Sequence, residues 1–311
     1  MRGEPIGRRT DMKKYCILYN PKAGNGKGAS NIEKLCESLG GQVSEQLDVT
    51  EITDFAQLFS SHSDEAFVLC GGDGTLNHFA NDTADLPLPE EVYYYATGSG
   101  NDFLRDIEKS EGELIPLKPY LEDLPICEVN GRSYRFLNGI GYGLDGYCCE
   151  VGDLARQKSP GKAINYTTIA IKGLLFLYKP TGATVTVDGK EYRFRKVWIA
   201  PTMNGRYFGG GMMAAPGQDR LSPEGELSLC VFHRSGKIHT LMVFPKIFKG
   251  EHVKSKITTI LTGKNITVEF DEPRTLQVDG ETVTGVKKYT VRSVKAAKLS
   301  EKAEDAVAVL S

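Results

Sequence analysis

The sequence Cys70-Gly71-Gly72-Asp73-Gly74-Thr75-Leu76-Asn77 places three glycines around one acidic residue, directly after the apolar run 66–69. The apolar run predicts a buried strand, and the glycines predict a loop whose backbone passes close to another group. Backbone N–H groups in such a loop can bind a phosphate, and Thr75 can begin a helix whose dipole points at it. The alternative is an ordinary turn between a strand and a helix, which glycine also serves.

The same combination of a strand and a glycine-rich loop occurs twice more. Residues 15–19 are followed by Asn20-Pro21-Lys22-Ala23-Gly24, and residues 92–95 by Thr97-Gly98-Ser99-Gly100-Asn101-Asp102-Phe103. Predicted strands and helices alternate across this part of the chain, as in a parallel, doubly wound sheet. Loops at the carboxyl ends of such strands meet at one edge, where open α/β sheets bind ligands.

The first glycine loop also has a competing interpretation. Gly24, Gly26 and Ala29 fit a loose form of the dinucleotide-binding pattern, and Asp48 lies about where a ribose-binding carboxylate would be expected. A dehydrogenase therefore remains an alternative, but it leaves the two later glycine loops unexplained. The loop is not a phosphate-binding Walker A sequence, because it lacks the GxxxxGK[ST] order.

The second half of the chain follows a different pattern. The dipeptides Asn130-Gly131, Asp188-Gly189 and Asp279-Gly280 each stand between short apolar segments, which predicts β-hairpins. We therefore expect an α/β plus all-β protein. Its parts are a disordered tail at 1–11, a Rossmann-like nucleotide-binding domain with a doubly wound parallel sheet at 12–120, an antiparallel β-sandwich at 121–292, and a segment at 293–311 that returns to the first domain.

Composition restricts the partners and the compartment. The 311 residues are 40% hydrophobic and carry a net charge of −2, so nucleic acid is not an expected partner. Seven cysteines without a CxxC pair predict reduced thiols in the cytoplasm. The longest apolar stretch, 163–178, is shorter than the ~20 residues of a membrane-spanning helix, so none is expected.

The string GGDGTxN, with NPxxG at 20–24 and a GTxNDF-like element in which Ser99 replaces threonine, resembles the signature of the diacylglycerol kinase, sphingosine kinase and bacterial lipid kinase family. This family belongs to a superfamily that also contains the NAD kinases. Further family-like sequences lie in the second half, and the resemblance extends from residue 12 to about residue 292. They are Asp123, residues 136–141, Asp145, residues 204–206, the glycines 209–211 and Val278-Asp279-Gly280-Glu281.

The resemblance implies an ATP- and Mg²⁺-dependent kinase that phosphorylates a lipid hydroxyl, with diacylglycerol as the first expectation. An NAD kinase-like enzyme, a sphingoid or other lipid kinase, and a catalytically silent lipid or nucleotide binder remain alternatives. The lipid substrate implies an enzyme peripheral to the membrane, and a homodimer is left open. Two segments would contact an anionic lipid surface: the apolar stretch 163–178, which has basic residues on both sides, and the basic cluster Lys246, Lys249, Lys254 and Lys256.

The resemblance also implies roles for individual residues. For the nucleotide these are Asn20, Pro21, Lys22, Ala23, Gly24, Gly71, Gly72, Asp73, Gly74, Thr75, Asn77, Ser99, Asn101 and Asp102. Asp73, Asp102 and Asp123 would hold or water-bridge the catalytic Mg²⁺, and Asp145 would lie in the substrate site. Glu281 is our candidate for the base because Asp279 and Gly280 are used by a turn, with Asp73 and Asp279 as its competitors.

A second magnesium site is implied at 221–226. The family has an LxxDG-type loop that binds a structural Mg²⁺ through a carboxylate and neighbouring carbonyls, and here it would comprise Leu221, Glu224 and Glu226. Glutamate replaces the family's aspartate at 224 and extends the carboxylate by one methylene. A simple Pro-Glu-Gly turn is an equal alternative.

Overall fold

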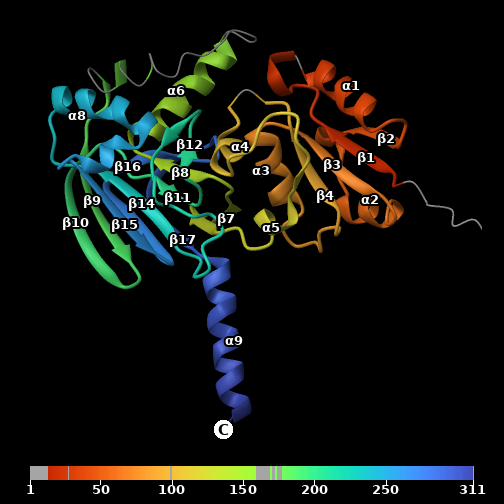
Figure 1. Ribbon diagram of the computed structural model, residues 1–311. Helices are drawn as coiled ribbons and strands as arrows, with labels where there is room; N and C mark the ends of the chain where they lie inside the picture. The colour runs from red at the N-terminus through yellow and green to blue at the C-terminus, as the bar shows by residue number, and fades with distance from the viewer. Residues whose placement is uncertain are drawn as a thin grey trace, which may run out of the picture. The chain divides into compact units, whose positions relative to one another are not determined.

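The computed structural model describes residues 13–26, 28–98, 100–158, 169, 172–173 and 177–310 (Figure 1). The tail predicted at 1–11 and most of the apolar stretch 163–178 lie outside these residues. Contacts divide the chain into two compact units. The first unit is Met1–Gly72, Asp85–Ser99 and Glu111–Lys118, and the second unit is Asp73–Ala84, Gly100–Ser110 and Pro119–Ser311.

The first unit contains a five-stranded sheet in the order β2-β1-β3-β4-β5. β1 pairs in parallel with β2 and β3, and β3 pairs in parallel with β4, whereas β5 is antiparallel to β4 at the edge. β3 is central and all of its residues are buried, as its apolar sequence predicts. The strands are β1 Tyr15–Tyr19, β2 Val43–Asp48, β3 Ala66–Gly71, β4 Val92–Ala96 and β5 Ile115–Pro116.

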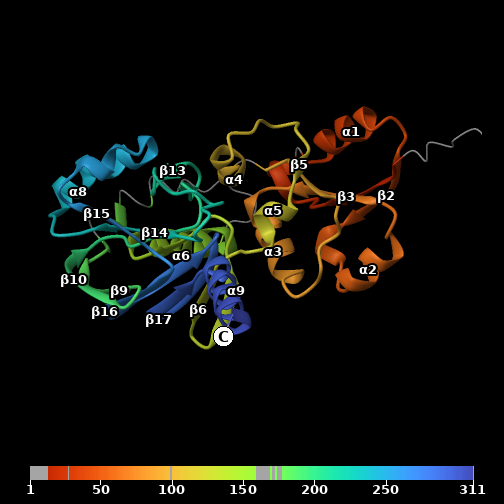
Figure 2. The same ribbon diagram turned by 60° about the horizontal axis from the view of Figure 1, so that its bottom comes forward.

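Helices cover both faces of this sheet, as Figure 2 shows for α1 (Gly28–Ser38) and α2 (Phe55–Ser61). α1 packs Ile32 against Val68, and α2 places Phe59 against Phe67 with ring centroids 5.1 Å apart. Successive residues of a strand point to opposite faces, so the two helices lie on opposite sides. The predicted doubly wound α/β arrangement is confirmed, with one antiparallel edge strand. Short 3₁₀ turns lie at Ala23–Gly26 and Val49–Glu51.

The second unit contains a ten-stranded sheet with the path β15-β14-β11-β8-β16-β17-β6-β7, and the β9–β10 hairpin joins it at β16. Every pairing in it is antiparallel. Its strands are β6 Ile126–Val129, β7 Arg132–Arg135, β8 Gly139–Tyr142, β9 Thr181–Val187, β10 Lys190–Val197, β11 Thr202–Met203, β14 Leu227–Phe232, β15 Thr258–Gly263, β16 Asn265–Val278 and β17 Glu281–Arg292. β12 Tyr207–Phe208 pairs separately with β13 Met212–Met213. The predicted β-sandwich is confirmed.

The three predicted hairpin turns are present, and both residues of each have positive φ. The values are 49° and 74° at Asn130-Gly131, 47° and 82° at Asp188-Gly189, and 45° and 99° at Asp279-Gly280. This is the geometry that two-residue hairpin loops require. Within the ten-stranded sheet, Tyr142 of β8 stacks on Phe270 of β16 with ring centroids 4.1 Å apart.

Among its described residues, the second unit has the helices α3 Asp73–Asp82, α4 Asp102–Asp106, α6 Leu144–Lys158, α8 Lys237–Val243 and α9 Val294–Leu310, with 3₁₀ turns at Phe244–Lys249 and Glu251–Lys254. A short helix, α5 Lys118–Leu121, lies where the chain passes from the first unit to the second. No helix in the described ranges is both long and apolar enough to cross a membrane.

The two units divide the chain differently from the predicted boundary at residue 120, because α3 and α4 belong to the second unit. The reason is that α3 forms hydrogen bonds with a residue 54 positions further along the chain. Asn81 on α3 donates to the carbonyl of Arg135 at 3.0 Å and accepts from its N–H at 2.9 Å. α9 belongs to the second unit, and its Lys298 pairs with Asp123 of the same unit. Its predicted return to the first domain stays a prediction.

Candidate active site

Within the first unit, the three glycine loops meet at the carboxyl edge of the sheet. The carbonyl of Gly71 accepts from the N–H groups of Thr97 at 2.8 Å and Gly98 at 3.1 Å, and Asn20 N–H donates to Cys70 at 3.1 Å. Gly24 has φ +65°, and a Cβ on it would lie 2.4 Å from the Thr97 carbonyl oxygen. Only glycine allows these two loops to approach so closely. Ser99 lies outside the described residues.

Within the second unit, Asp73 begins α3 and its carboxylate is held from two sides. Its Oδ2 accepts from Asp102 N–H at 2.9 Å, and its Oδ1 accepts from Phe103 N–H at 2.8 Å. The side-chain amide of Asn138 donates to the same Oδ1 at 3.2 Å. The loop before β8 and the first turn of α4 therefore fix the orientation of Asp73.

The carboxylate of Asp279 binds three successive N–H groups. Its Oδ1 accepts from Asn138 and Gly139 at 2.9 Å each, and its Oδ2 accepts from Leu137. Burial raises the pKa of Asp279 to about 6, against the effect of these hydrogen bonds. The Asp279-Gly280 turn thus positions the backbone of Asn138, whose side chain orients Asp73.

A buried ionic cluster of Asp106, Arg206 and Arg220 also contacts Asn138. Asp106 accepts from Arg220 and from the Nε of Arg206 at 2.9 Å, and only 3% of its side chain is exposed. Arg220, 5% exposed, also donates to the Asn138 Oδ1 at 2.9 Å and to the Leu137 carbonyl at 3.1 Å. Hydrogen bonds therefore run without a break from Asp106 through Arg220 and Asn138 to Asp73.

Asp102 is the second acid beside Asp73. Burial, and then the negative charge of Asp73, raise the pKa of Asp102 to about 6, while the Gly210 N–H that donates to its Oδ2 at 2.7 Å opposes this shift. Its buried Oδ1 accepts no hydrogen bond from the described residues, and the Arg105 guanidinium lies 3.6 Å away. Two neighbouring carboxylates are the type of donor that Mg²⁺ prefers, although this Oδ1 of Asp102 forms an ion pair with Arg105.

Two further predicted site residues, Glu281 and Asp145, are associated with the Asp279-Gly280 turn. Glu281 is exposed and pairs with His78 of α3 at 3.2 Å. Asp145 accepts from the side-chain amide of Gln277 at 3.0 Å, and Gln277 accepts from Gly280 N–H at 2.6 Å. Burial raises the pKa of Asp145 to about 6. Asp145 is thus connected to the same turn as Asp279 and Glu281.

Three of the four other predicted metal ligands contact lysines. Asp123 pairs with Lys298 at 2.6 Å, and Glu224 pairs with Lys264 at 3.1 Å. The carbonyl of Leu221 accepts from Lys295 at 3.3 Å. Glu226 accepts from Gln218 only through its backbone carbonyl, at 2.8 Å. In the part of the chain that the structure describes, no three His, Cys, Asp or Glu side chains form a metal-binding group. The Glu224 carboxylate and the Leu221 carbonyl therefore already contact lysines, and Asp123 pairs with Lys298.

Sequence reasoning missed Asp106 and Arg220, which organise this site, and it gave no role to Asn138 and Arg206, which lie in the family-like segments 136–141 and 204–206. Asn138 had a visible signal, because it stands alone as a polar residue in the apolar sequence Phe136-Leu137-Asn138-Gly139-Ile140. Asp106 and Arg220 had none, since their pairing spans 114 positions of sequence.

The chain thus combines a mostly parallel α/β sheet with convergent glycine loops, an antiparallel β-sandwich and an aspartate held at the start of α3. Two family models match the chain. The diacylglycerol kinase catalytic domain matches residues 14–118, and the YegS C-terminal NAD kinase beta sandwich-like domain matches residues 139–297, just over half of the chain. The chain belongs to this family of diacylglycerol kinase-like lipid kinases.

Individual relatives agree with this assignment. The diacylglycerol kinase of Mycobacterium tuberculosis is 25% identical over 280 residues, which cover 84% of this chain and 87% of that protein. The diacylglycerol kinase of Bacillus subtilis is 24% identical over 284 residues, with 87% and 90% covered. A crystal structure of a diacylglycerol kinase from Bacillus anthracis has a TM-score of 0.58 at 19% identity, with 91% and 94% covered. That last similarity concerns the fold.

Proposed function

We propose that this protein is an ATP-dependent lipid kinase that transfers the γ-phosphoryl group of ATP to the hydroxyl of diacylglycerol and forms phosphatidic acid. The observation that carries the proposal is the carboxylate of Asp73, which follows a glycine loop and is held by two N–H groups and the Asn138 amide. Phosphoryl transfer requires mainly positioning and charge stabilisation from the protein. The choice of a lipid hydroxyl rests on the family.

In this reaction the lipid hydroxyl oxygen forms a bond to the γ-phosphorus, and the bond from that phosphorus to the bridging oxygen breaks. ADP leaves with the electron pair, and the hydroxyl proton passes to a carboxylate, for which we propose Glu281. Such a group orients the hydroxyl and accepts its proton late, which contributes roughly 10²–10⁴ in rate. Asp73 and Asp102 would hold Mg²⁺, which neutralises phosphate charge when it is bound.

The glycine loops have the complementary role of binding the nucleotide. Residues 20–24 and 71–75 would offer backbone N–H groups to the phosphates, and Lys22, which is exposed, would balance their charge.

The first experiment is a turnover assay with labelled ATP and a panel of diacylglycerol, monoacylglycerol, ceramide, sphingosine, phosphatidylglycerol and NAD. We expect diacylglycerol to be phosphorylated, and Asp73→Asn at saturating Mg²⁺ to lose at least ~10²-fold in kcat with the fold retained. Asp188→Asn is the matched control, because Asp188 also accepts backbone N–H groups, from Lys264 and Asn265, but in a different hairpin. Full activity of Asp73→Asn would contradict the proposed role.

We also propose that the enzyme reaches its substrate by docking on an anionic lipid surface through residues 237–256. Exposed lysines at 246, 249, 254 and 256 lie here, and so do four of the eight exposed large apolar side chains of the described residues. Those four are Ile238 (73% exposed), Met242 (61%), Phe248 and Val253. Each lysine near an anionic leaflet contributes about 1 kcal/mol, and apolar side chains at helical spacing can enter the interface.

Co-sedimentation with vesicles measures this docking. Binding should rise with the fraction of anionic lipid and fall in the double variant Lys246→Glu/Lys249→Glu and in Ile238→Glu. Leu299→Glu replaces an equally apolar, 41% exposed side chain on α9 and should bind as the unmodified protein does. Binding that is indifferent to anionic lipid, or equal losses in Ile238→Glu and Leu299→Glu, would refute this surface.

A further inference from the structure

The loop at residues 221–226 lies directly against the start of α9. Gly225 has φ +69°, and a Cβ on it would lie 2.5 Å from the Ser293 Oγ and 2.9 Å from the Ala296 nitrogen. Ser293 caps the helix, because its Oγ accepts from Ala296 N–H at 3.1 Å. A change in the conformation of this loop would therefore alter the packing of the first turn of α9.

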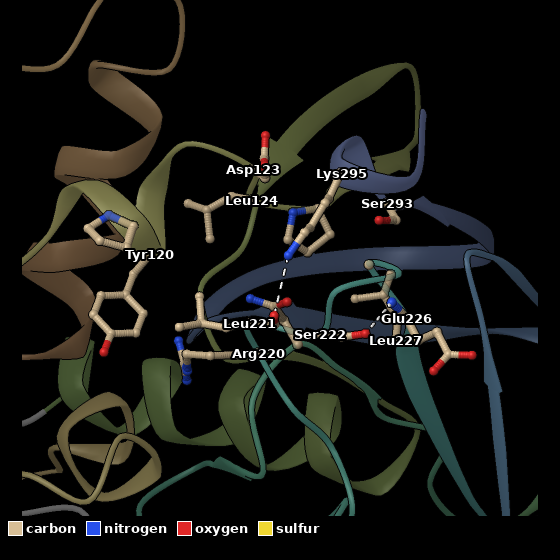
Figure 3. Close-up of a pocket in the computed structure, with 14 residues that line it drawn as sticks. Tyr120, Asp123, Leu124, Arg220, Leu221, Ser222, Glu226, Leu227, Ser293 and Lys295 are labelled. Atoms are coloured by element: carbon tan, nitrogen blue, oxygen red, sulfur yellow. Dashed lines mark hydrogen bonds between the residues drawn. The ribbon is translucent and has the colours of Figure 1, made fainter. Parts of the chain in front are cut away.

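Three lysines bind oxygen atoms in this loop and beside it. Lys295 lies on the first turn of α9 and crosses a small cavity of about 50 Å³ to reach the carbonyl of Leu221 at 3.3 Å (Figure 3). Lys298, one turn further on, pairs with Asp123, which lines the same cavity. Lys264 pairs with Glu224 at 3.1 Å, and its own carbonyl accepts from Ser293 N–H.

We infer that these lysine ammonium groups take the place of a structural divalent cation, so that the 221–226 loop of this protein is ordered without metal. Mg²⁺ binds oxygen ligands at about 2.0–2.1 Å. It could reach these oxygens only by displacing the ammonium groups that now donate to them, and their positive charges would repel it. The glutamate at position 224 agrees with this, since its carboxylate extends to Lys264.

The inference differs from the proposed function in that it concerns stability, and it is testable on inactive protein. The measurement is the thermal unfolding midpoint in EDTA and in excess Mg²⁺ or Ca²⁺, in an Asp73→Asn background that weakens the catalytic cation site. We expect no shift for this parent. A triple variant Lys264→Met/Lys295→Met/Lys298→Met frees the oxygens of Glu224, Leu221 and Asp123, and it should gain about 3–6 °C when the cation is at ten times its dissociation constant.

Two further variants make the result specific. Lys287→Met removes an exposed lysine that pairs with Glu269 elsewhere, and it should gain no dependence on cations. Lys264→Arg/Lys295→Arg/Lys298→Arg keeps all three positive charges and should behave as the parent. The inference is overturned if the parent itself is stabilised by the cation and Glu224→Gln abolishes that shift, or if the triple methionine variant gains none. The parent measurement decides the question even if that variant does not fold.

Discussion

Replacement of Arg220 by methionine tests the buried ionic cluster behind Asp73. Methionine keeps an apolar stem against the Phe103 ring, over which the guanidinium now lies at 4.7 Å, but it removes every hydrogen bond to Asp106, Leu137 and Asn138. Removal of one partner from a buried ion pair costs about 3–5 kcal/mol, because a buried charge is left with less compensation. Arg206 still binds Asp106, so the lower half of that range is expected.

The control is Arg193→Met. Arg193 also binds a carboxylate, that of Asp271 at 2.6 Å, but the two side chains are 50% and 46% exposed. An exposed pair of this kind contributes about 0.2–1 kcal/mol. Urea unfolding followed by fluorescence of Trp198, the single tryptophan, reports on the second unit. The reasoning is refuted if Arg220→Met loses less than about 1 kcal/mol, or if Arg193→Met loses as much.

Further outcomes are expected at other residues. Glu281→Gln should lower kcat steeply while ATP binding, measured by calorimetry, persists. Asp279→Asn should lower the free energy of unfolding by about 1–3 kcal/mol, because one of the three N–H groups that donate to Asp279 then faces an amide NH₂. Gly24→Ala should weaken ATP binding in the same titration, since its Cβ would collide with the Thr97 carbonyl. Burial raises the pKa of Asp145 to about 6, so its contribution to stability is complete below its unfolded pKa near 4 and is lost as the pH rises to about 6. The unfolding free energy of the unmodified protein relative to Asp145→Asn should therefore fall by about 2 kcal/mol between pH 4.5 and 7.5, and a constant difference would contradict this.

The features that sequence predicted well are those in which local pattern decides the structure. Alternation of apolar strands with glycine loops predicts the sheet of the first unit, and asparagine or aspartate followed by glycine predicts the three hairpins. Asp73 and Asp102 were recognisable because each stands beside glycines at the end of a strand.

The features that sequence did not predict depend on contacts between distant segments. In the sequence, Asp106 and Arg220 resemble ordinary surface residues. In the folded protein they are buried and form an ion pair. The lysines at 264, 295 and 298 could not be matched to Glu224, Leu221 and Asp123 either, because no spacing relates them. The family pattern suggests a metal at this loop, whereas in this protein the Glu224 carboxylate and the Leu221 carbonyl contact lysines.

The hydrogen bonds of Asp279 also determine how activity data on its turn must be interpreted. Asp279 fixes the backbone of Asn138, and the Asn138 amide orients Asp73, so Asp279→Asn would disturb Asp73 without Asp279 touching a substrate. A loss of activity in that variant alone is therefore no evidence that Asp279 is the base. Glu281 has no such connection, since its described contact is the exposed pair with His78. If Glu281 accepts the proton, Glu281→Gln loses kcat with an unchanged unfolding free energy, whereas a folded Asp279→Asn that is inactive beside a fully active Glu281→Gln reverses the assignment.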